Sequence, residues 1–316
     1  MGSSFAEATR QSFVVMKNEI KKYFSGKRMF VFMALLAIIV FVIVVAPYMF
    51  NSEADPVYFL MMSSLVVLMA STLFASISIV SEYEERTALI VFTRPIRKTS
   101  IFVGKAMACI VLTISFMALY YVIAVLVSAA INGSVSGDIL VSFGLSCAYA
   151  FGTIGVAMFV SSIMKKGSTA TIITFVILAV IITAFSMVLN AAKVDSFWMI
   201  DQAADSIMSC SQEYRDMMNE MYRSLGEMLA NPSTFILEQF YSPALLNGAT
   251  YEQLITALLT PTGPNGEYAW SLGEAASAFG QMEVSEPDYV RDVFVMIGWG
   301  AISMVAAFFA FLRREF

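Results

Sequence analysis

Long apolar stretches alternate with short polar connections along most of the chain. Each of these stretches has at least 20 residues and contains no Asp, Glu, Lys or Arg. They are Met29–Ser52, Pro56–Ser81, Ala106–Gly137, Ile139–Met164, Gly167–Ala192 and Val293–Leu312. Because an α-helix rises about 1.5 Å per residue, about 20 residues cross the hydrocarbon core of a bilayer. The pattern therefore predicts an all-α, polytopic membrane protein with six transmembrane helices.

The basic residues predict how these helices are oriented. Most of the 19 Lys and Arg residues precede the first stretch, lie in the Ser81–Lys105 connection, or stand at Lys165-Lys166 and Arg313-Arg314. The connections Asn51–Pro56 and Asn132–Asp138 hold acids and no bases. Since cytoplasmic loops carry the excess of Lys and Arg, both termini are predicted to be cytoplasmic. We expect a multi-pass protein of a prokaryotic plasma membrane, and no cleavable signal peptide, because the first stretch is too long for one.

Residues 1–28 precede the first stretch and are predicted to form an amphipathic helix. Its apolar residues recur at helical spacing, and its basic residues lie elsewhere on the helical wheel. The apolar positions are Phe13, Met16, Ile20 and Phe24, and the basic ones are Lys17, Lys21 and Lys22. Such a helix usually lies flat in the membrane interface with its apolar face toward lipid. The alternative is a solvated cytoplasmic arm.

Residues 193–290 form the largest polar region, which the topology places outside. Between Asp195 and Asp288 the only bases are Arg215 and Arg223. Nine positions there, all apolar but one, alternate in steps of four and three, which predicts one long amphipathic helix that ends at Asn231-Pro232. These positions are Ile200, Ala204, Ile207, Ser211, Tyr214, Met218, Met221, Leu225 and Met228.

Shorter helices are expected further along this outer region. One is predicted at Thr250–Leu259, and another after the capping pair Ser271 and Glu274. Ser285 with Asp288 resembles the start signal of the last span. The predicted domains are thus 1–28, 29–192 with five spans, the extracytoplasmic helical domain 193–290, and 291–316 with the sixth span and a short tail.

Missing chemistry restricts the function further. The chain has no histidine, so histidine-based acid–base catalysis and histidine-ligated metals are excluded. It also has no Walker-type phosphate loop, which predicts that it is not itself an ATP-hydrolysing enzyme. Ion-coupled carriers usually keep a titratable residue inside the membrane, so the charge-free stretches argue against ion coupling.

The apolar stretches do contain hydroxyl and small side chains. The second stretch holds Ser63, Ser64, Ser71, Thr72, Ser76 and Ser78, and the fifth holds Thr171, Thr174 and Thr183. In the fourth stretch Gly144, Ala148 and Gly152 form a stripe that lets helices approach closely. Helix packing and the lining of a substrate path are both consistent with these residues.

The connection between the second and third stretches carries the most specific pattern. Its features are Glu82, Glu84, Thr87, the Pro95-Ile96-Arg97 turn and Gly104-Lys105. Together they resemble the permeases of type-2 ATP-binding-cassette (ABC) exporters, in which a segment of this form joins spans two and three. The interfacial helix, six spans and an outer insertion before span six are also similar to that family. Arg86 stands where such permeases usually have glycine.

The resemblance implies a mechanism and a set of partners. In such permeases the connection is a coupling helix that docks on a separate ATPase subunit. By the resemblance, the ATPase-coupling residues would be Glu82, Glu84, Thr87, Leu89, Ile90, Phe92, Arg94, Pro95 and Arg97. The implied complex has two ATPase copies, which bind ATP and Mg²⁺, and a second permease copy, either identical or closely related. This chain itself would bind no cofactor and would contact membrane lipid but no nucleic acid.

Other interpretations remain open at this point. The outer region could receive cargo or dock an extracytoplasmic partner. Met217, Met218 and Met221 with Cys210 offer soft ligands for Cu(I), although methionines on a helix seam also simply pack. A stand-alone channel or carrier, and a membrane-anchored receptor or scaffold that presents the outer domain, are the competing functional classes.

Overall fold

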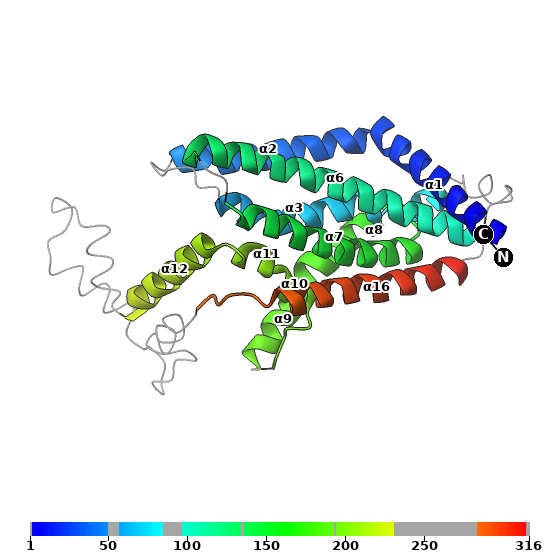
Figure 1. The fold of residues 1–316 in the computed structure, drawn as a ribbon. Coiled ribbons are helices and arrows are strands. Elements are labelled where there is room, and N and C mark those ends of the chain that lie inside the picture. Colours follow the sequence, from blue (N-terminus) through cyan, green and yellow to red (C-terminus); the bar gives the residue numbers. More distant parts are fainter. Residues whose placement is uncertain are drawn as a thin grey trace. The chain divides into compact units, whose positions relative to one another are not determined.

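The structure is a computed structural model that describes residues 2–49, 57–84, 97–133, 136–192, 194–230 and 283–313. The described part of the chain is helical (Figure 1). Its helices are α1 (Gly2–Ser25), α2 (Lys27–Met49), α3 (Val57–Ala75), α4 (Val80–Glu84), α6 (Lys98–Asn132), α7 (Asp138–Ile163), α8 (Gly167–Val176), the π-helical turn η1 (Ile177–Ile181), α9 (Ile182–Ala191), α10 (Ile200–Ala204), α11 (Ser206–Ser209), α12 (Gln212–Ala230) and α16 (Tyr289–Arg313). The chain divides into two compact units, Met1–Ser211 with Pro287–Phe316, and Gln212–Glu286.

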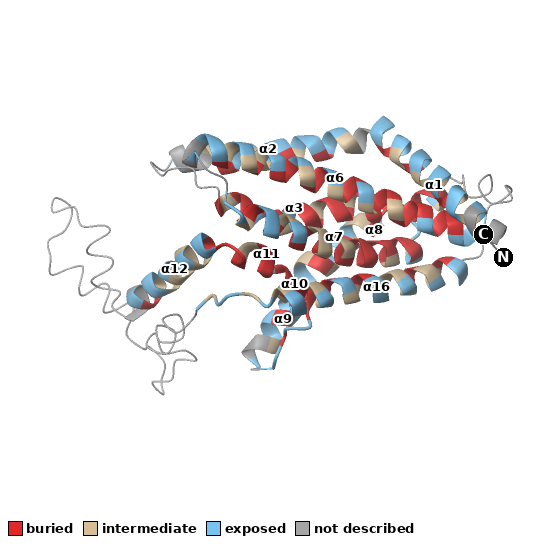
Figure 2. Cartoon of the chain, viewed as in Figure 1, coloured by how far each residue is buried: buried red, intermediate tan, exposed pale blue. Residues whose placement is uncertain are grey.

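The first unit is a helical bundle around α7. Helix α7 packs against α16 along its length and also against α3 and α6, while α1 packs against α6. Figure 2 shows the result: α7 is largely buried, whereas α2 and α9 are largely exposed. An apolar helix that exposes apolar side chains is stable where hydrocarbon surrounds it. The outer helices of the bundle therefore have the surface of membrane-spanning elements.

Among the described residues, five helical segments are long and apolar enough to cross a membrane. They are Val57–Glu84, Lys98–Ala130, Asp138–Ile163, Gly167–Leu189 and Tyr289–Arg313. The N-terminal pair Glu7–Ser25 and Met29–Val45 meets the same criterion only jointly, with a bend of 67° between its two helices. The part of the chain that the structure describes is thus an all-helical, multi-pass membrane protein.

Helix ends follow the local chemistry of the chain. Helix α6 ends at Gly133, whose φ of 66° is a left-handed conformation that glycine adopts without steric cost. The start of α16 is capped by Asp288, whose Oδ1 accepts a hydrogen bond from the Arg291 backbone N–H at 3.2 Å. The Ser285–Asp288 signal therefore marks the start of α16, with Asp288 as the capping residue.

The prediction of one long amphipathic helix over residues 200–228 is wrong, because three separate helices occupy this range. Helices α10 and α11 are short and separate, and α12 begins only at Gln212. Ile200 and Ile207 are buried against the bundle, where α10 packs on α16 and α7, and α11 packs on α3 and α7. Tertiary burial of these isoleucines has overridden the continuous helix that their spacing predicts.

The second unit is described for α12 and residues 283–286. Val284 donates its backbone N–H to Asn219 Oδ1 of α12 at 2.7 Å, and Arg223 pairs with Glu227 one turn further on, at 3.2 Å. Met217 and Met218 are partly buried on α12, and Met221 is exposed. The helices predicted at Thr250–Leu259 and after Ser271 lie outside the described residues.

Hydroxyl groups of the second and fifth stretches are used within the bundle. Ser63, Ser71 and Thr72 each donate to a backbone carbonyl one turn earlier in α3. Thr174 does the same in α8, with Ala170 as its acceptor at 2.7 Å. All four are buried, so the structure gives these residues a packing role.

Candidate functional site

Three buried charged side chains of the described residues meet around Lys105. Its side chain is 1 % exposed, and its Nζ lies 2.6 Å from Glu19 Oε1 and 2.7 Å from Glu82 Oε1. The same ammonium group donates to the backbone carbonyl of Ser78 at 2.7 Å. An ammonium group has three N–H donors, so these three acceptors satisfy it completely. We call Glu19, Glu82 and Lys105 the buried ion cluster.

The cluster corrects the expectation of charge-free spans. The apolar stretches themselves contain no charge, but α6 begins at Lys98, so Lys105 lies two turns inside the helix. Glu82 similarly lies in α4, at the end of the segment Val57–Glu84. Burying a charge is costly unless it is paired and hydrogen-bonded, and the cluster meets both conditions. The cluster joins α1, α4 and α6, because Glu19 of α1 and Glu82 of α4 both pair with Lys105 of α6.

A close approach of two backbones brings Glu19 to Lys105. A Cβ atom added to Gly104 would lie 2.6 Å from the Ser12 carbonyl oxygen and 2.7 Å from Val15 Cβ, so only glycine fits there. One turn earlier in α6, Ser100 Oγ donates to the Ala8 carbonyl at 3.3 Å. The Gly104-Lys105 pair therefore has two linked roles: the glycine admits α1, and the lysine binds its carboxylate.

The helix break before α4 is held by α7. Helix α3 ends at Ala75, and α4 begins at Val80. Ser161 Oγ of α7 accepts hydrogen bonds from the backbone N–H groups of Ile79, at 3.1 Å, and Val80, at 3.2 Å. The first N–H groups of a helix have no partner within the helix, so this hydroxyl satisfies donors that the break exposes.

The end of α4 is held in turn by α8. Glu84 Oε2 accepts a hydrogen bond from the backbone N–H of Gly167, the first residue of α8, at 2.8 Å. A carboxylate at a helix N-terminus is favoured both by this bond and by the helix dipole. Ser76 Oγ and Thr171 Oγ1, 2.9 Å apart, provide a second contact to the same helix.

The predicted coupling residues that the structure describes differ in their exposure. Glu82 is 8 % exposed and belongs to the buried ion cluster, where its carboxylate pairs with Lys105, and its coupling role stays a prediction. Glu84 is exposed but bound to Gly167 N, and Arg97 is exposed immediately before α6. The other predicted coupling residues, Thr87, Leu89, Ile90, Phe92, Arg94 and Pro95, lie outside the described residues.

The N-terminal helix presents two different faces. Ser12, Glu19 and Tyr23 are buried on the side toward the bundle, where Tyr23 donates its hydroxyl to the Phe74 carbonyl at 2.7 Å. Phe13 is 51 % exposed and Phe24 57 %, whereas Met16 and Ile20 are partly buried, and Lys17 and Lys21 are exposed. The face that packs inward is thus partly polar, and apolar side chains remain on the outside.

Sequence reasoning did not identify Glu19, Ser161 or Gly167 as members of the site. One signal for Glu19 is present: it is the only acid among the bases between Lys17 and Lys22. Ser161 and Gly167 carry no such signal, because serine and glycine are common in membrane helices. Their contacts depend on how α7 and α8 sit against α4.

A second junction, without charge, lies further along α6. Tyr121 Oη is 2.7 Å from Ser142 Oγ and 2.8 Å from Ser146 Oγ of α7. Ser142 Oγ in turn donates to the Ile207 carbonyl of α11 at 2.7 Å. We call Tyr121, Ser142 and Ser146 the hydroxyl network; it joins α6, α7 and α11 as the buried ion cluster joins α1, α4 and α6.

The predicted small-residue stripe of α7 marks a close contact at one end only. A Cβ on Gly152 would lie 2.6 Å from Ile200 Cδ1 and 2.9 Å from the Met296 carbonyl, and one on Gly155 would lie 2.6 Å from the Gly300 carbonyl. A Cβ on Gly144 would meet nothing within 4 Å. Ala148 is partly buried between them.

The bundle and its helical segments define a multi-pass membrane protein. A family model described as "ABC-2 family transporter protein" matches residues 49–316, and the chain belongs to this family. No curated protein matches the chain. The resemblance carried by the Ser81–Lys105 connection is therefore confirmed at the level of the family, and the chain is an ABC-2-type permease.

Proposed function

We propose that this chain is the permease subunit of an ABC exporter, in which it converts ATP hydrolysis by a separate ATPase subunit into motion of its spans. The observation that carries the proposal is that internal contacts hold both ends of the predicted coupling segment. Its start is bound at Glu82 and Glu84, and its end at Lys105. A force applied to the segment between them would reach α1, α6 and α8 together.

The proposed topology has six spans, with the bent N-terminal pair supplying the first as α2 and an interfacial helix as α1. The exposed Phe13 and Phe24 support an interfacial α1, since they offer an apolar surface to lipid. The start of α1 and the end of α16 lie at the same end of the bundle (Figure 1), as expected for an even number of spans. Phe102 of α6 packs against Phe308 and Phe311 of α16, with ring centroids 5.4 and 5.9 Å apart.

The remaining partners follow from this assignment. Two ATPase copies would bind ATP and Mg²⁺, while the permease itself would carry out no chemistry and bind no cofactor. A second permease copy would complete the transport path in a prokaryotic plasma membrane, with both termini in the cytoplasm. Residues 193–290 would face the outside, where they would contact cargo or an extracytoplasmic partner.

Purification in mild detergent, followed by mass spectrometry, tests the proposal. We expect a stoichiometric subunit with a Walker motif, which is lost when Leu89→Asp places a charge in the predicted docking helix. Glu220→Lys on α12 is the matched control, because Glu220 is exposed and distant in sequence from the segment. A pure, folded preparation without any ATPase would contradict the coupling role and would favour a membrane-anchored scaffold.

A second comparison separates docking from transmission. The triple variant Glu19→Gln, Glu82→Gln and Lys105→Met removes every charge of the buried ion cluster together. We expect it to retain the ATPase subunit but to lose most ATP-driven transport, because α1, α4 and α6 no longer move as one body. Normal transport by this variant would show that the cluster serves stability alone.

A further inference from the structure

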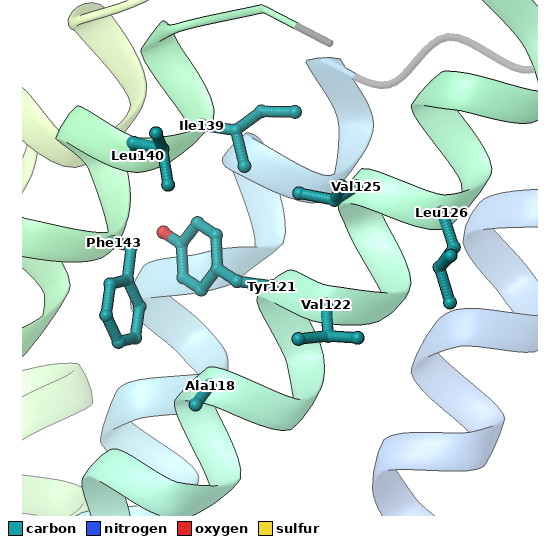
Figure 3. A pocket seen from close by; sticks show the side chains of 8 residues that line it. All are labelled: Ala118, Tyr121, Val122, Val125, Leu126, Ile139, Leu140 and Phe143. Atoms are coloured by element: carbon teal, nitrogen blue, oxygen red, sulfur yellow. The ribbon is translucent and has the colours of Figure 1, made fainter.

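An apolar pocket opens between α6 and α7, beside the hydroxyl network. Its volume is about 260 Å³, and it is lined by Ala118, Tyr121, Val122, Val125, Leu126, Ile139, Leu140 and Phe143. Figure 3 shows the Tyr121 ring in the middle of these side chains, with Ile139, Leu140 and Phe143 of α7 on one side and Val122 and Val125 of α6 on the other. Phe143 stands edge-on to Tyr121, with ring centroids 5.4 Å apart.

The wall of this pocket offers hydrocarbon and almost nothing else. The only side-chain oxygen among the lining residues belongs to Tyr121, and it is held by Ser142 and Ser146. A polar ligand entering the pocket would lose its hydrogen bonds to water without replacement, at a cost of several kcal/mol. The chemistry of the wall therefore selects an occupant that is hydrocarbon over its whole buried length.

The surroundings of the pocket show where such an occupant comes from. Both walls belong to segments that are long and apolar enough to cross a membrane. The rim residues Val122, Leu126 and Leu140 are 54, 64 and 70 % exposed, so the opening faces the medium around the spans. Within a membrane that medium is the bilayer hydrocarbon.

The size and shape of the pocket fit a single acyl chain better than a larger ligand. Sites for drug-sized ligands usually enclose roughly 300–1,000 Å³, which is more than this pocket provides. The lining of α6 runs from Ala118 to Leu126, which is about 12 Å along a helix axis. We propose that this pocket binds one acyl chain of a membrane phospholipid, next to the Tyr121 contact that joins α6 to α7 and α11.

Photo-crosslinking in proteoliposomes tests this proposal. The probe is a phosphatidylcholine with a diazirine on one acyl chain, and labelled peptides are mapped by mass spectrometry. We expect labels to concentrate at Val122–Leu126 and Ile139–Phe143. Ala118→Phe fills the pocket and should reduce this labelling at least fivefold, whereas Ala129→Phe, which adds the same ring at an exposed alanine of α6, should leave it unchanged.

A second pair of variants covers the case in which Ala118→Phe does not fold. Val122→Trp closes the rim from an exposed position, and Val111→Trp makes the same change at an exposed valine of α6 outside the pocket. Labelling that is equal over all lipid-facing spans and unaffected by Ala118→Phe or Val122→Trp would overturn the proposal. So would a photoreactive residue at position 122 that crosslinks to a second copy of the chain instead of lipid.

Discussion

Two of the junctions that fasten helix α6 to its neighbours have opposite chemistry. At Lys105 the buried ion cluster joins it to α1 and α4 through three charges, and at Tyr121 the hydroxyl network joins it to α7 and α11 through neutral groups. The two residues are 16 positions apart, or about 24 Å along the helix. The two junctions differ in the free energy that is lost when one of their side chains is removed.

The difference lies in how each junction tolerates a missing partner. Removing one member of a buried ion pair leaves an uncompensated charge away from water, which costs far more than the pair itself contributes. Hydroxyls in a membrane bundle find substitute acceptors, and their individual contributions average well below 2 kcal/mol. The charged junction therefore resists separation of its helices and is suited to transmit their movement, whereas the helices of the neutral junction can shift relative to one another at lower cost.

The largest effect is expected at the charged junction. Lys105→Met leaves Glu19 and Glu82 buried without their shared cation, and should destabilise the protein by about 3–5 kcal/mol. Thermal unfolding in detergent, followed by fluorescence-detected size-exclusion chromatography, measures the loss. The triple variant described above should recover most of it, because no charge then stays unpaired. A Lys105→Met protein as stable as the parent would show that the cluster is not buried in solution.

Helix α7 holds the start of α4 through Ser161, belongs to the hydroxyl network through Ser142 and Ser146, and packs closely against α16. Gly155→Ala forces a Cβ against the Gly300 backbone and should destabilise the bundle by about 1–3 kcal/mol through overpacking. Gly144→Ala is the matched control: its Cβ meets nothing within 4 Å, and alanine is the better helix former. Its unfolding midpoint should stay the same or rise. Equal destabilisation by both variants would contradict the close approach of α7 and α16.

The hydrogen bond between Glu84 of α4 and Gly167 of α8 connects the charged junction to a further helix. Glu84→Ala removes the acceptor of the Gly167 N–H, and loss of such a cap typically costs about 1 kcal/mol. Glu84→Gln keeps an oxygen at the same place and should behave almost like the parent. We expect ATP-driven transport to fall several-fold in Glu84→Ala while the ATPase stays bound. Release of the ATPase by both variants would instead indicate direct docking by Glu84.

The two junctions also differ in how far the sequence could predict them. Helices α3, α6, α7 and α16 follow from charge-free stretches of sufficient length, because membrane hydrocarbon imposes that pattern on any spanning helix. Glu82, Glu84 and Lys105 were recognised as a group from their spacing in one connection. The sequence did not predict that Glu19 of α1 pairs with Lys105 or that Gly167 of α8 binds Glu84, because these contacts depend on how the helices pack.

The neutral junction left almost no signal in the sequence. Tyr121 and Ser142 stand in ordinary apolar stretches, and the seam of alternating threes and fours concealed the breaks before and after α11. A periodic pattern reports which positions are apolar, and it gives the same signal whether one long helix or several short ones bury them. The Ile207 carbonyl, which accepts the Ser142 hydroxyl, lies in the short helix between these breaks.

The smallest effect is expected at this neutral junction. Tyr121→Phe keeps the ring that lines the apolar pocket and removes only the hydroxyl shared by Ser142 and Ser146. Ser142 retains the Ile207 carbonyl as acceptor, so the loss should be about 1 kcal/mol or less. The same unfolding assay used for Lys105→Met makes the two junctions directly comparable. A loss in Tyr121→Phe as large as in Lys105→Met would mean that hydroxyls fasten α6 as firmly as charges do, and the contrast between a transmitting and a yielding junction would fail.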